Sequence, residues 1–203
     1  FETLGFTKLT PRIVQVMGGE EAAFGDPGSL FAPQEEISLD DVADAKSLNS
    51  DFYTDKTVAV HVVLDGKTPF RTIETAYLSN GDTIVKTNDT KAVLPVLQGA
   101  KAIVTTQTKE LIEALGDESP AEISLFNNDN TARIHDMSLL AYLLDPTRTN
   151  YGYLYLTERF SVPSIASGSV DVECVSMVKA LLAMNDVACE SARREELWSL
   201  YET

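Results

Sequence analysis

The sequence predicts an α/β fold with a mixed sheet whose first three strands are antiparallel. Three observations support this prediction. Residues 57–64 form a β-branched apolar run, an Asn-Gly pair at 80–81 separates two further strand-like segments, and the periodicity changes to that of alternating helices and strands after residue 90. A helical tail beginning near residue 171 completes the pattern. The expected architecture is therefore a mixed sheet with flanking helices and a helical C-terminal tail.

The composition is that of a globular protein. The chain has 203 residues, 44% of them apolar, which is enough for a sizeable core. No apolar run approaches the ~20 residues that span a bilayer, and no basic segment followed by an apolar one opens the chain. We therefore expect no membrane association and a cytoplasmic location. Cys174 and Cys189 are expected to be buried thiols, because a helix would hold them roughly 22 Å apart.

The charge balance argues against a strong affinity for nucleic acid. Sixteen basic residues stand against 31 acidic ones, which gives a net charge of −15. Proteins bind phosphate backbones mainly through Lys and Arg, which displace counterions. We therefore expect the isolated chain to bind DNA weakly or not at all.

Residues 1–50 are expected to precede the domain as a segment and linker. An apolar set with helical spacing stops at Gly18 and Gly19, and a loop-like, increasingly acidic stretch follows. The domain itself is expected over residues 51–203. It opens with a buried central strand at 57–64, because β-branched apolar residues occupy both of its faces.

The elements that follow alternate between strands and helices. A second strand is expected at 70–78, the Asn80-Gly81 turn follows, and a third strand is expected at 83–87. Helices are expected at 91–97, 107–115, 151–160, 171–188 and 192–201, and strands at 101–105, 121–126 and 131–135. Three strands, then alternating strands and helices, then a helical tail is the element order of an RNase H-like fold.

The densest apolar segment is a helix expected between Asp136 and Pro146. Asp136 can accept hydrogen bonds from the free N–H groups of a first turn, and Pro146 ends the helix. Met137, Leu140 and Leu144 form one stripe, and Leu139 and Leu143 form a second beside it. These two stripes predict a helix that is buried on more than one side.

This segment also carries a family resemblance. "HDMSLLAYLLDP" at residues 135–146 resembles "FDTMLAAYLLDP" in the 3′–5′ exonuclease domain of family A DNA polymerases, the bacterial DNA polymerase I type. The C-terminal "EELWSLYE" is similar to the "LLWLYEE" that leads into the polymerase domain, and the opening "FETLGF" is similar to the end of the preceding 5′-nuclease region. The resemblance implies a DnaQ-like exonuclease fold over 51–203 and a role in DNA replication and repair.

Active members of that family hold metal ions with three motifs. A central strand carries Asp-x-Glu, a later helix carries an Asp, and the C-terminal helix carries Tyr-x-x-x-Asp. In this sequence the residues at those five positions are His61, Val63, Lys109, Glu173 and Met177.

These replacements imply that the metal site is lost. Val63 and Met177 cannot ligate a hard cation, and Lys109 repels one. A shift of one residue would place Glu110 at the second motif, but one carboxylate cannot hold two divalent ions. His61, in an apolar strand, is expected to be buried and neutral.

The resemblance therefore implies a catalytically inactive domain that acts as a structural spacer. It is expected to bind no cofactor, and Mg²⁺ is expected only in a polymerase domain following Thr203, outside this sequence. That polymerase domain is the implied partner, and DNA contacts are expected only through the full-length enzyme.

Two alternatives stay open. The first is an active 3′–5′ exonuclease with relocated metal ligands, for which the candidates are Asp65, Glu74 and Glu173. The second is a stand-alone acidic interaction module that docks a basic partner. The cluster that motivates it consists of Asp40, Asp41, Asp44, Asp51 and Asp55. No phosphate-binding loop, HExxH, GxSxG or paired CxxC motif points to any other class of enzyme.

Overall fold

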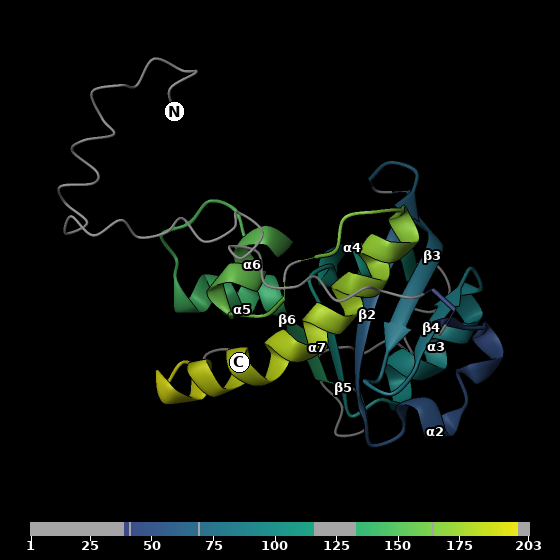
Figure 1. Cartoon of the computed structure of the whole chain (residues 1–203), viewed down its shortest axis with the longest axis horizontal. Coiled ribbons are helices and arrows are strands. Elements are labelled where there is room, and N and C mark those ends of the chain that lie inside the picture. The colour runs from purple at the N-terminus through teal and green to yellow at the C-terminus, as the bar shows by residue number, and fades with distance from the viewer. Residues whose placement is uncertain (1–38, 41, 69, 116–132, 164, 199–203) are drawn as a thin grey trace, which may run out of the picture. The chain divides into compact units, whose positions relative to one another are not determined.

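The computed structural model describes residues 39–40, 42–68, 70–115, 133–163 and 165–198 (Figure 1). They belong to one compact unit of the chain. The strand expected at 121–126 lies outside the described residues. In the part of the chain that is described, no helix is long and apolar enough to cross a membrane.

A six-stranded mixed sheet forms the centre of the structure, with the strand order β1-β4-β3-β2-β5-β6. Its strands are β1 (Val42–Ala43), β2 (Thr57–Asp65), β3 (Thr72–Ser79), β4 (Ile84–Thr87), β5 (Ala102–Thr105) and β6 (Arg133–Asp136). β3 pairs antiparallel with both β2 and β4, whereas β1, β5 and β6 pair parallel with their neighbours. The predicted mixed sheet with three antiparallel strands is confirmed, and β1 adds a strand from the stretch that was expected to be a linker.

Helices cover both faces of this sheet. They are α2 (Ser50–Tyr53), α3 (Thr90–Gly99), α4 (Thr108–Leu115), α5 (Met137–Leu144), α6 (Tyr153–Arg159) and α7 (Val170–Arg194), and a short 3₁₀ turn, η3, spans Ala45–Ser47. α5, α6 and α7 pack with one set of core residues, and α2, α3 and α4 pack with the other. Figure 1 shows α7 crossing one face of the sheet.

β2 separates the two cores. Val58, Val60 and Val62 belong to the core under α3 and α4, whereas Ala59 belongs to the core under α7. Because successive side chains of a strand point to opposite faces, a strand covered on both faces is apolar at nearly every position. The expected buried central strand is confirmed.

α7 is longer than the sequence indicated. We expected one helix to end near residue 188 and another to begin near 192, but a single helix runs through Val170–Arg194. Ala188, Cys189 and Ala192 are all buried and continue the apolar stripe. No Gly or Pro lies between 188 and 192 to stop the helix, so packing carries it across the expected break.

α5 is capped as expected but is less buried than expected. The Asp136 side chain accepts hydrogen bonds from the backbone N–H groups of Ser138 (2.9 Å) and Leu139 (3.1 Å). Leu140 is fully buried, but Leu139 is 49% exposed and Tyr142 48% exposed. The prediction of burial on more than one side was therefore wrong.

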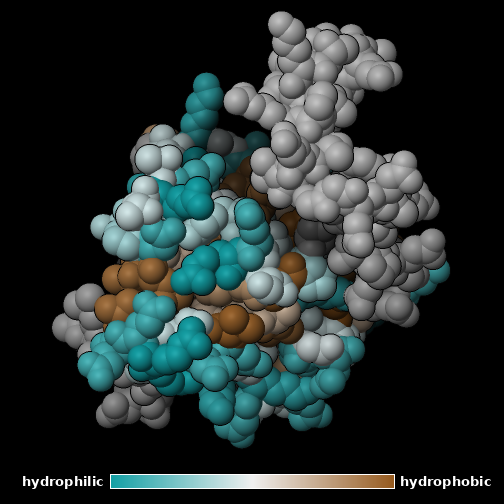
Figure 2. All heavy atoms as spheres, turned by 60° about the vertical axis from the view of Figure 1, so that its left-hand side comes forward, coloured by the Kyte–Doolittle hydropathy of each residue, from teal (hydrophilic) through white to brown (hydrophobic). Residues whose placement is uncertain are grey.

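The reason is the position of α5 at the edge of the sheet, directly after the edge strand β6. Leu139 and Tyr142 line an open groove of about 600 Å³ between α4 and α5, where Ile112 faces them. Figure 2 brings forward the side of Figure 1 on which α5 and α6 lie, and it shows apolar residues open to solvent between hydrophilic ones. Apolar side chains on a surface are common, so an apolar pattern alone does not prove burial.

Asp145 organises the corner between α5 and α6. Its carboxylate accepts hydrogen bonds from the backbone N–H of Thr147 (3.2 Å), from the Thr147 hydroxyl (2.6 Å) and from the Tyr155 hydroxyl (3.2 Å). Its backbone carbonyl accepts from the Tyr151 hydroxyl at 2.7 Å. The bonds from Thr147 are the main cause of a pKa below the usual range for this carboxyl group. The corner after α5 is thus held from several directions.

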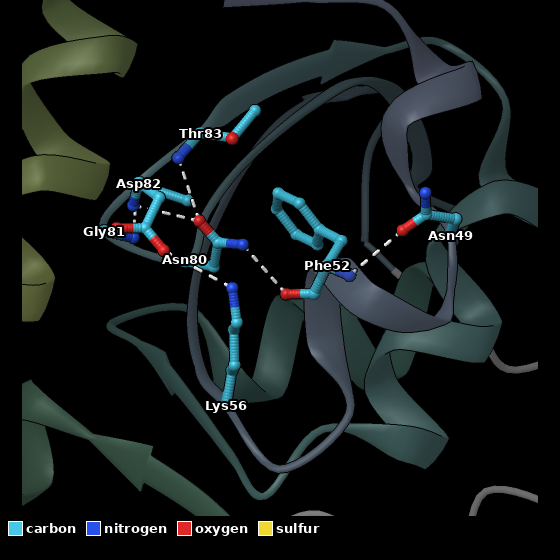
Figure 3. Close-up of polar contacts among 8 residues, drawn as sticks. Asn49, Phe52, Lys56, Asn80, Gly81, Asp82 and Thr83 are labelled. Atoms are coloured by element: carbon cyan, nitrogen blue, oxygen red, sulfur yellow. Dashed lines mark hydrogen bonds and ion pairs between the residues drawn. The ribbon is translucent and has the colours of Figure 1, made fainter.

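Asn80 ties the β3–β4 turn to α2 (Figure 3). Its side-chain oxygen accepts from the backbone N–H groups of Asp82 (3.0 Å) and Thr83 (2.9 Å), and its side-chain amide donates to the carbonyl of Phe52 (3.0 Å). Gly81 adopts the left-handed conformation, with φ at 94°. The predicted tight turn is confirmed, although in this pair only Gly81 takes a positive φ.

Replacing Asn80 with alanine should destabilise the domain by about 1–3 kcal/mol, because it leaves three backbone groups without partners. Urea unfolding followed by circular dichroism measures this difference. Lys56→Ala is the matched control, since it removes only an exposed ion pair to Asp82 (3.4 Å) and should cost less than about 0.5 kcal/mol. Equal losses in the two variants would contradict the assigned role of Asn80.

Candidate functional site

The candidate site begins at two positions of β2. His61 and Val63 are two residues apart on the strand and therefore share one face of the sheet. Val63 packs against the core under α7, and His61 is 9% exposed. These are the positions at which active members of the family that the sequence resembles carry two acids.

Tyr153 of α6 lies directly against His61. Their rings meet edge to face, with centroids 5.8 Å apart, and the Tyr153 hydroxyl is hydrogen-bonded to Nδ1 of His61 at 3.2 Å. Burial lowers the pKa of His61 to about 4, so the imidazole is neutral at pH 7 as expected. Burial also raises the pKa of the Tyr153 phenol, and Thr106 is a second hydrogen-bonding neighbour of that phenol.

Gln107 was not identified from the sequence. β2 and β5 pair only as far as Ala59 and Val104, and the Gln107 side chain extends that pairing. Its Oε1 accepts from the backbone N–H of Val62 at 2.9 Å, and its Nε2 donates to the carbonyl of Val62 at 3.0 Å. Gln107 therefore fixes the backbone of β2 between His61 and Val63.

The expected second-motif residues are engaged elsewhere. Lys109 is 82% exposed at its side chain and pairs with Glu113 at 3.9 Å, one turn along α4. Glu110 pairs with Arg71 at 3.9 Å. The α4 side chains that pack against the sheet are Leu111 and Leu115, which lie in the core on the other face from Ala59.

Several α7 residues join the core on this face of β2, Cys174 among them, whereas the expected Met177 does not. Cys174 is 4% exposed, belongs to the same core as Val63 and Tyr153, and is near enough to Tyr153 to influence its pKa. Burial, followed by the charge of Asp171, raises the pKa of the Cys174 thiol to about 11, so the thiol is protonated at neutral pH. Met177 is half-buried and lies outside this cluster. Both cysteines are free and buried, as expected.

Asp171 fastens the first turn of α7 to the sheet. Lys86 of β4 contacts both of its carboxylate oxygens at 2.8 Å, and the buried Tyr77 of β3 donates its hydroxyl to the same carboxylate. These bonds, with that from Lys86 the largest cause, lower the pKa of Asp171. Glu173, expected at the Tyr position of the third motif, is half-buried in the same turn. The carboxylate of Asp171 is thus occupied by its ion pair with Lys86.

The proposed relocated ligands do not come together. Among the described residues, no group of three or more His, Cys, Asp or Glu side chains is arranged to hold a metal ion. Glu74 is exposed, Glu173 is half-buried, and the Asp65 carboxylate accepts a hydrogen bond from the backbone N–H of Gly66 at 2.7 Å.

The side chains around β2 do not fit the two divalent ions that an exonuclease of this kind uses. His61 offers a ring whose Nδ1 is already hydrogen-bonded, Val63 offers no donor atom, and the Cys174 thiol is suited to softer metals.

Three aspartates of the acidic cluster lie at turns or helix starts. Asp44 precedes the η3 turn, Asp51 lies in the first turn of α2, and Asp55 adopts a left-handed conformation with φ at 59°. Asp41 lies outside the described residues. Nothing in these positions marks a docking surface, and the acidic-module hypothesis stays a prediction.

The sequence matches no protein-family model, and no curated protein matches it. Solved structures do resemble the fold. Brucella melitensis NrnC bound to pGG has a TM-score of 0.55 and 17% identity, covering 76% of this chain and 81% of that chain. The Aedes aegypti Nibbler EXO domain has a TM-score of 0.55 and 11% identity, covering 82% and 95%.

A polymerase structure is also similar. The POL domain of Pol1 from M. smegmatis, in complex with a DNA primer-template and dNTP, has a TM-score of 0.58 and 18% identity. The match covers 77% of this chain but 27% of that chain. At such identities the similarity shows the fold alone. The chain has the RNase H-like fold of the 3′–5′ exonucleases.

Proposed function

We propose that the chain is a catalytically inactive 3′–5′ exonuclease-like domain of a DNA polymerase I type enzyme, in which it serves as a structural spacer. The observation that carries this proposal is the environment of β2. Where the resemblance requires Asp-x-Glu, the structure has a buried neutral His61 hydrogen-bonded to Tyr153, followed by the aliphatic Val63.

The chemistry of phosphodiester hydrolysis explains why this matters. Metal-dependent nucleases activate the attacking water and stabilise the leaving oxygen with two divalent ions held by carboxylates. Around β2 this chain offers an imidazole, an aliphatic side chain and a protonated thiol. None of the three supplies the anionic oxygen ligands that Mg²⁺ or Mn²⁺ requires.

The polymerase context rests on the sequence. The run at 135–146 and the C-terminal "EELWSLYE" resemble the corresponding segments of DNA polymerase I, and the similarity in fold to Pol1 from M. smegmatis is in keeping with that context. The proposed partner is a polymerase domain following Thr203 in the same polypeptide. Mg²⁺ and DNA would act in that domain, while this one holds its neighbours at a set spacing in an enzyme of replication and repair.

The proposal predicts that the purified chain releases no nucleotides from 3′-labelled single-stranded DNA in Mg²⁺ or Mn²⁺. A gel assay against a heat-treated sample measures this. Isothermal titration should show no Mn²⁺ site tighter than about 1 mM.

A trace of contaminating nuclease would be recognised by its separation from the chain on gel filtration. EDTA-sensitive release that co-elutes with the chain and disappears in Asp65→Ala, Glu74→Ala or Glu173→Ala would reject the proposal. It would instead support an active exonuclease.

A further inference from the structure

We infer that Tyr153 is a plug that closes the pocket over β2, so that the domain is silenced by occupied space as well as by missing carboxylates. This inference rests on the proposed function. Tyr153 belongs to none of the three metal-binding motifs. The inference predicts that its ring must be removed, in addition to restoring the acids, before the space over β2 can hold a cation.

Four segments contribute to the surroundings of Tyr153. Tyr153 is the first residue of α6, His61 lies in the middle of β2, Cys174 lies in the first turns of α7 and Thr106 lies directly after β5. Val63 packs against the same core. One aromatic ring thus closes the space between the strand and two helices.

The hydrogen bonds of Tyr153 stabilise its ring in the position over β2. A buried phenol is costly unless its hydroxyl is paired. Here the hydroxyl is hydrogen-bonded to Nδ1 of His61 and has Thr106 as a second neighbour. Burial keeps the imidazole neutral, so no buried charge stands beside the phenol. An aspartate at position 61 would be an anion buried beside the same ring.

The position of α6 is also fixed. Tyr151 and Tyr155 flank Tyr153 in sequence, and both donate to Asp145, at 2.7 Å and 3.2 Å. Their rings stack edge to face with centroids 5.6 Å apart. The helix that carries Tyr153 is therefore held at the corner after α5 and is not free to swing away from β2.

The first test measures the reactivity of Cys174 with a thiol reagent, followed by peptide mass spectrometry. Tyr153→Ala should raise the rate at Cys174 by roughly tenfold or more, because removing the ring opens the core that Tyr153 shares with this thiol to water and reagent. Cys189 is an internal control on the same helix, since it is equally buried (4%) and its pKa is likewise raised to about 11.

Two control variants distinguish the effect of the Tyr153 ring from the effect of its hydroxyl and from a general loosening of α6. Tyr153→Phe keeps the ring and should leave Cys174 protected. Tyr155→Ala removes a neighbouring tyrosine of the same helix and should not expose Cys174 selectively. If Tyr153→Ala leaves Cys174 unreactive, or exposes Cys189 equally, the ring is an ordinary core residue and the inference is wrong.

The second test restores the acids. His61→Asp with Val63→Glu should gain no Mn²⁺-dependent rise in melting temperature while Tyr153 is present, and should gain one when Tyr153→Ala is added. Mn²⁺ stabilisation with Tyr153 in place, or none in the triple variant, would overturn the inference. Nuclease activity of the unmodified chain would reject the proposed function instead, so the two failures are distinguishable.

Discussion

Leu140→Ala should lower the free energy of unfolding by about 3 kcal/mol, whereas Leu139→Ala should change it by less than about 0.5 kcal/mol. The two leucines are adjacent on α5, yet Leu140 is fully buried in the core shared with α7 and Leu139 is 49% exposed. Truncating Leu140 removes packed methyl groups and leaves a cavity. Truncating Leu139 mainly removes surface that already contacts water.

Urea unfolding of both variants, followed by tryptophan fluorescence and circular dichroism, measures the difference. The pair is internally matched, because the substitution is identical and both positions have the same helix propensity cost. Equal destabilisation by the two substitutions would mean that the groove between α4 and α5 is filled in solution. Our assignment of an exposed face on α5 would then be wrong.

The stability of the domain should fall by about 2 kcal/mol between about pH 7.5 and about pH 5 because of His61 alone. The imidazole has a pKa of about 4 in the folded chain against 6.5 as the ordinary value, and burial is the cause. The unfolded chain therefore takes up a proton first as the pH falls. The stabilising contribution is complete above pH ~6.5 and is lost progressively toward pH ~4.

Denaturant unfolding at a series of pH values measures this effect, and His61→Gln provides the reference. The wild-type curve minus the variant curve isolates His61 from the many carboxylates that also titrate in acid. In NMR spectra the resonance that disappears in the variant should titrate near pH 4 in the wild type. Parallel pH profiles for the two proteins would show that His61 is accessible to water.

Local patterns were sufficient to predict the parts of the fold that depend on near neighbours. The β-branched run of β2, the Asn80-Gly81 turn and the Asp136 cap each follow from the chemistry of a few consecutive residues. The order of these elements was enough to predict the RNase H-like class. That His61 and Val63 share one face of the sheet could also be predicted, because successive side chains of a strand alternate between its two faces.

The rest depended on packing between distant elements. The exposure of Leu139 is set by where α4 lies, and Tyr153 reaches His61 across 92 residues of sequence. Which α7 side chains lie in the core with Tyr153 depends on how that helix packs, and a count along the sequence cannot detect this. Gln107 had one usable signal, a long polar side chain directly after a buried strand.

Asp145 has a consequence for how such domains are recognised. The "LLDP" signature is part of the segment that carries the family resemblance, and in the structure its aspartate stabilises the corner after α5 through Thr147, Tyr151 and Tyr155. A stable scaffold needs such a residue whether or not the domain hydrolyses nucleic acid. A search keyed to this signature therefore detects the scaffold, and hydrolysis must be judged at the strand and helix that would hold the ions.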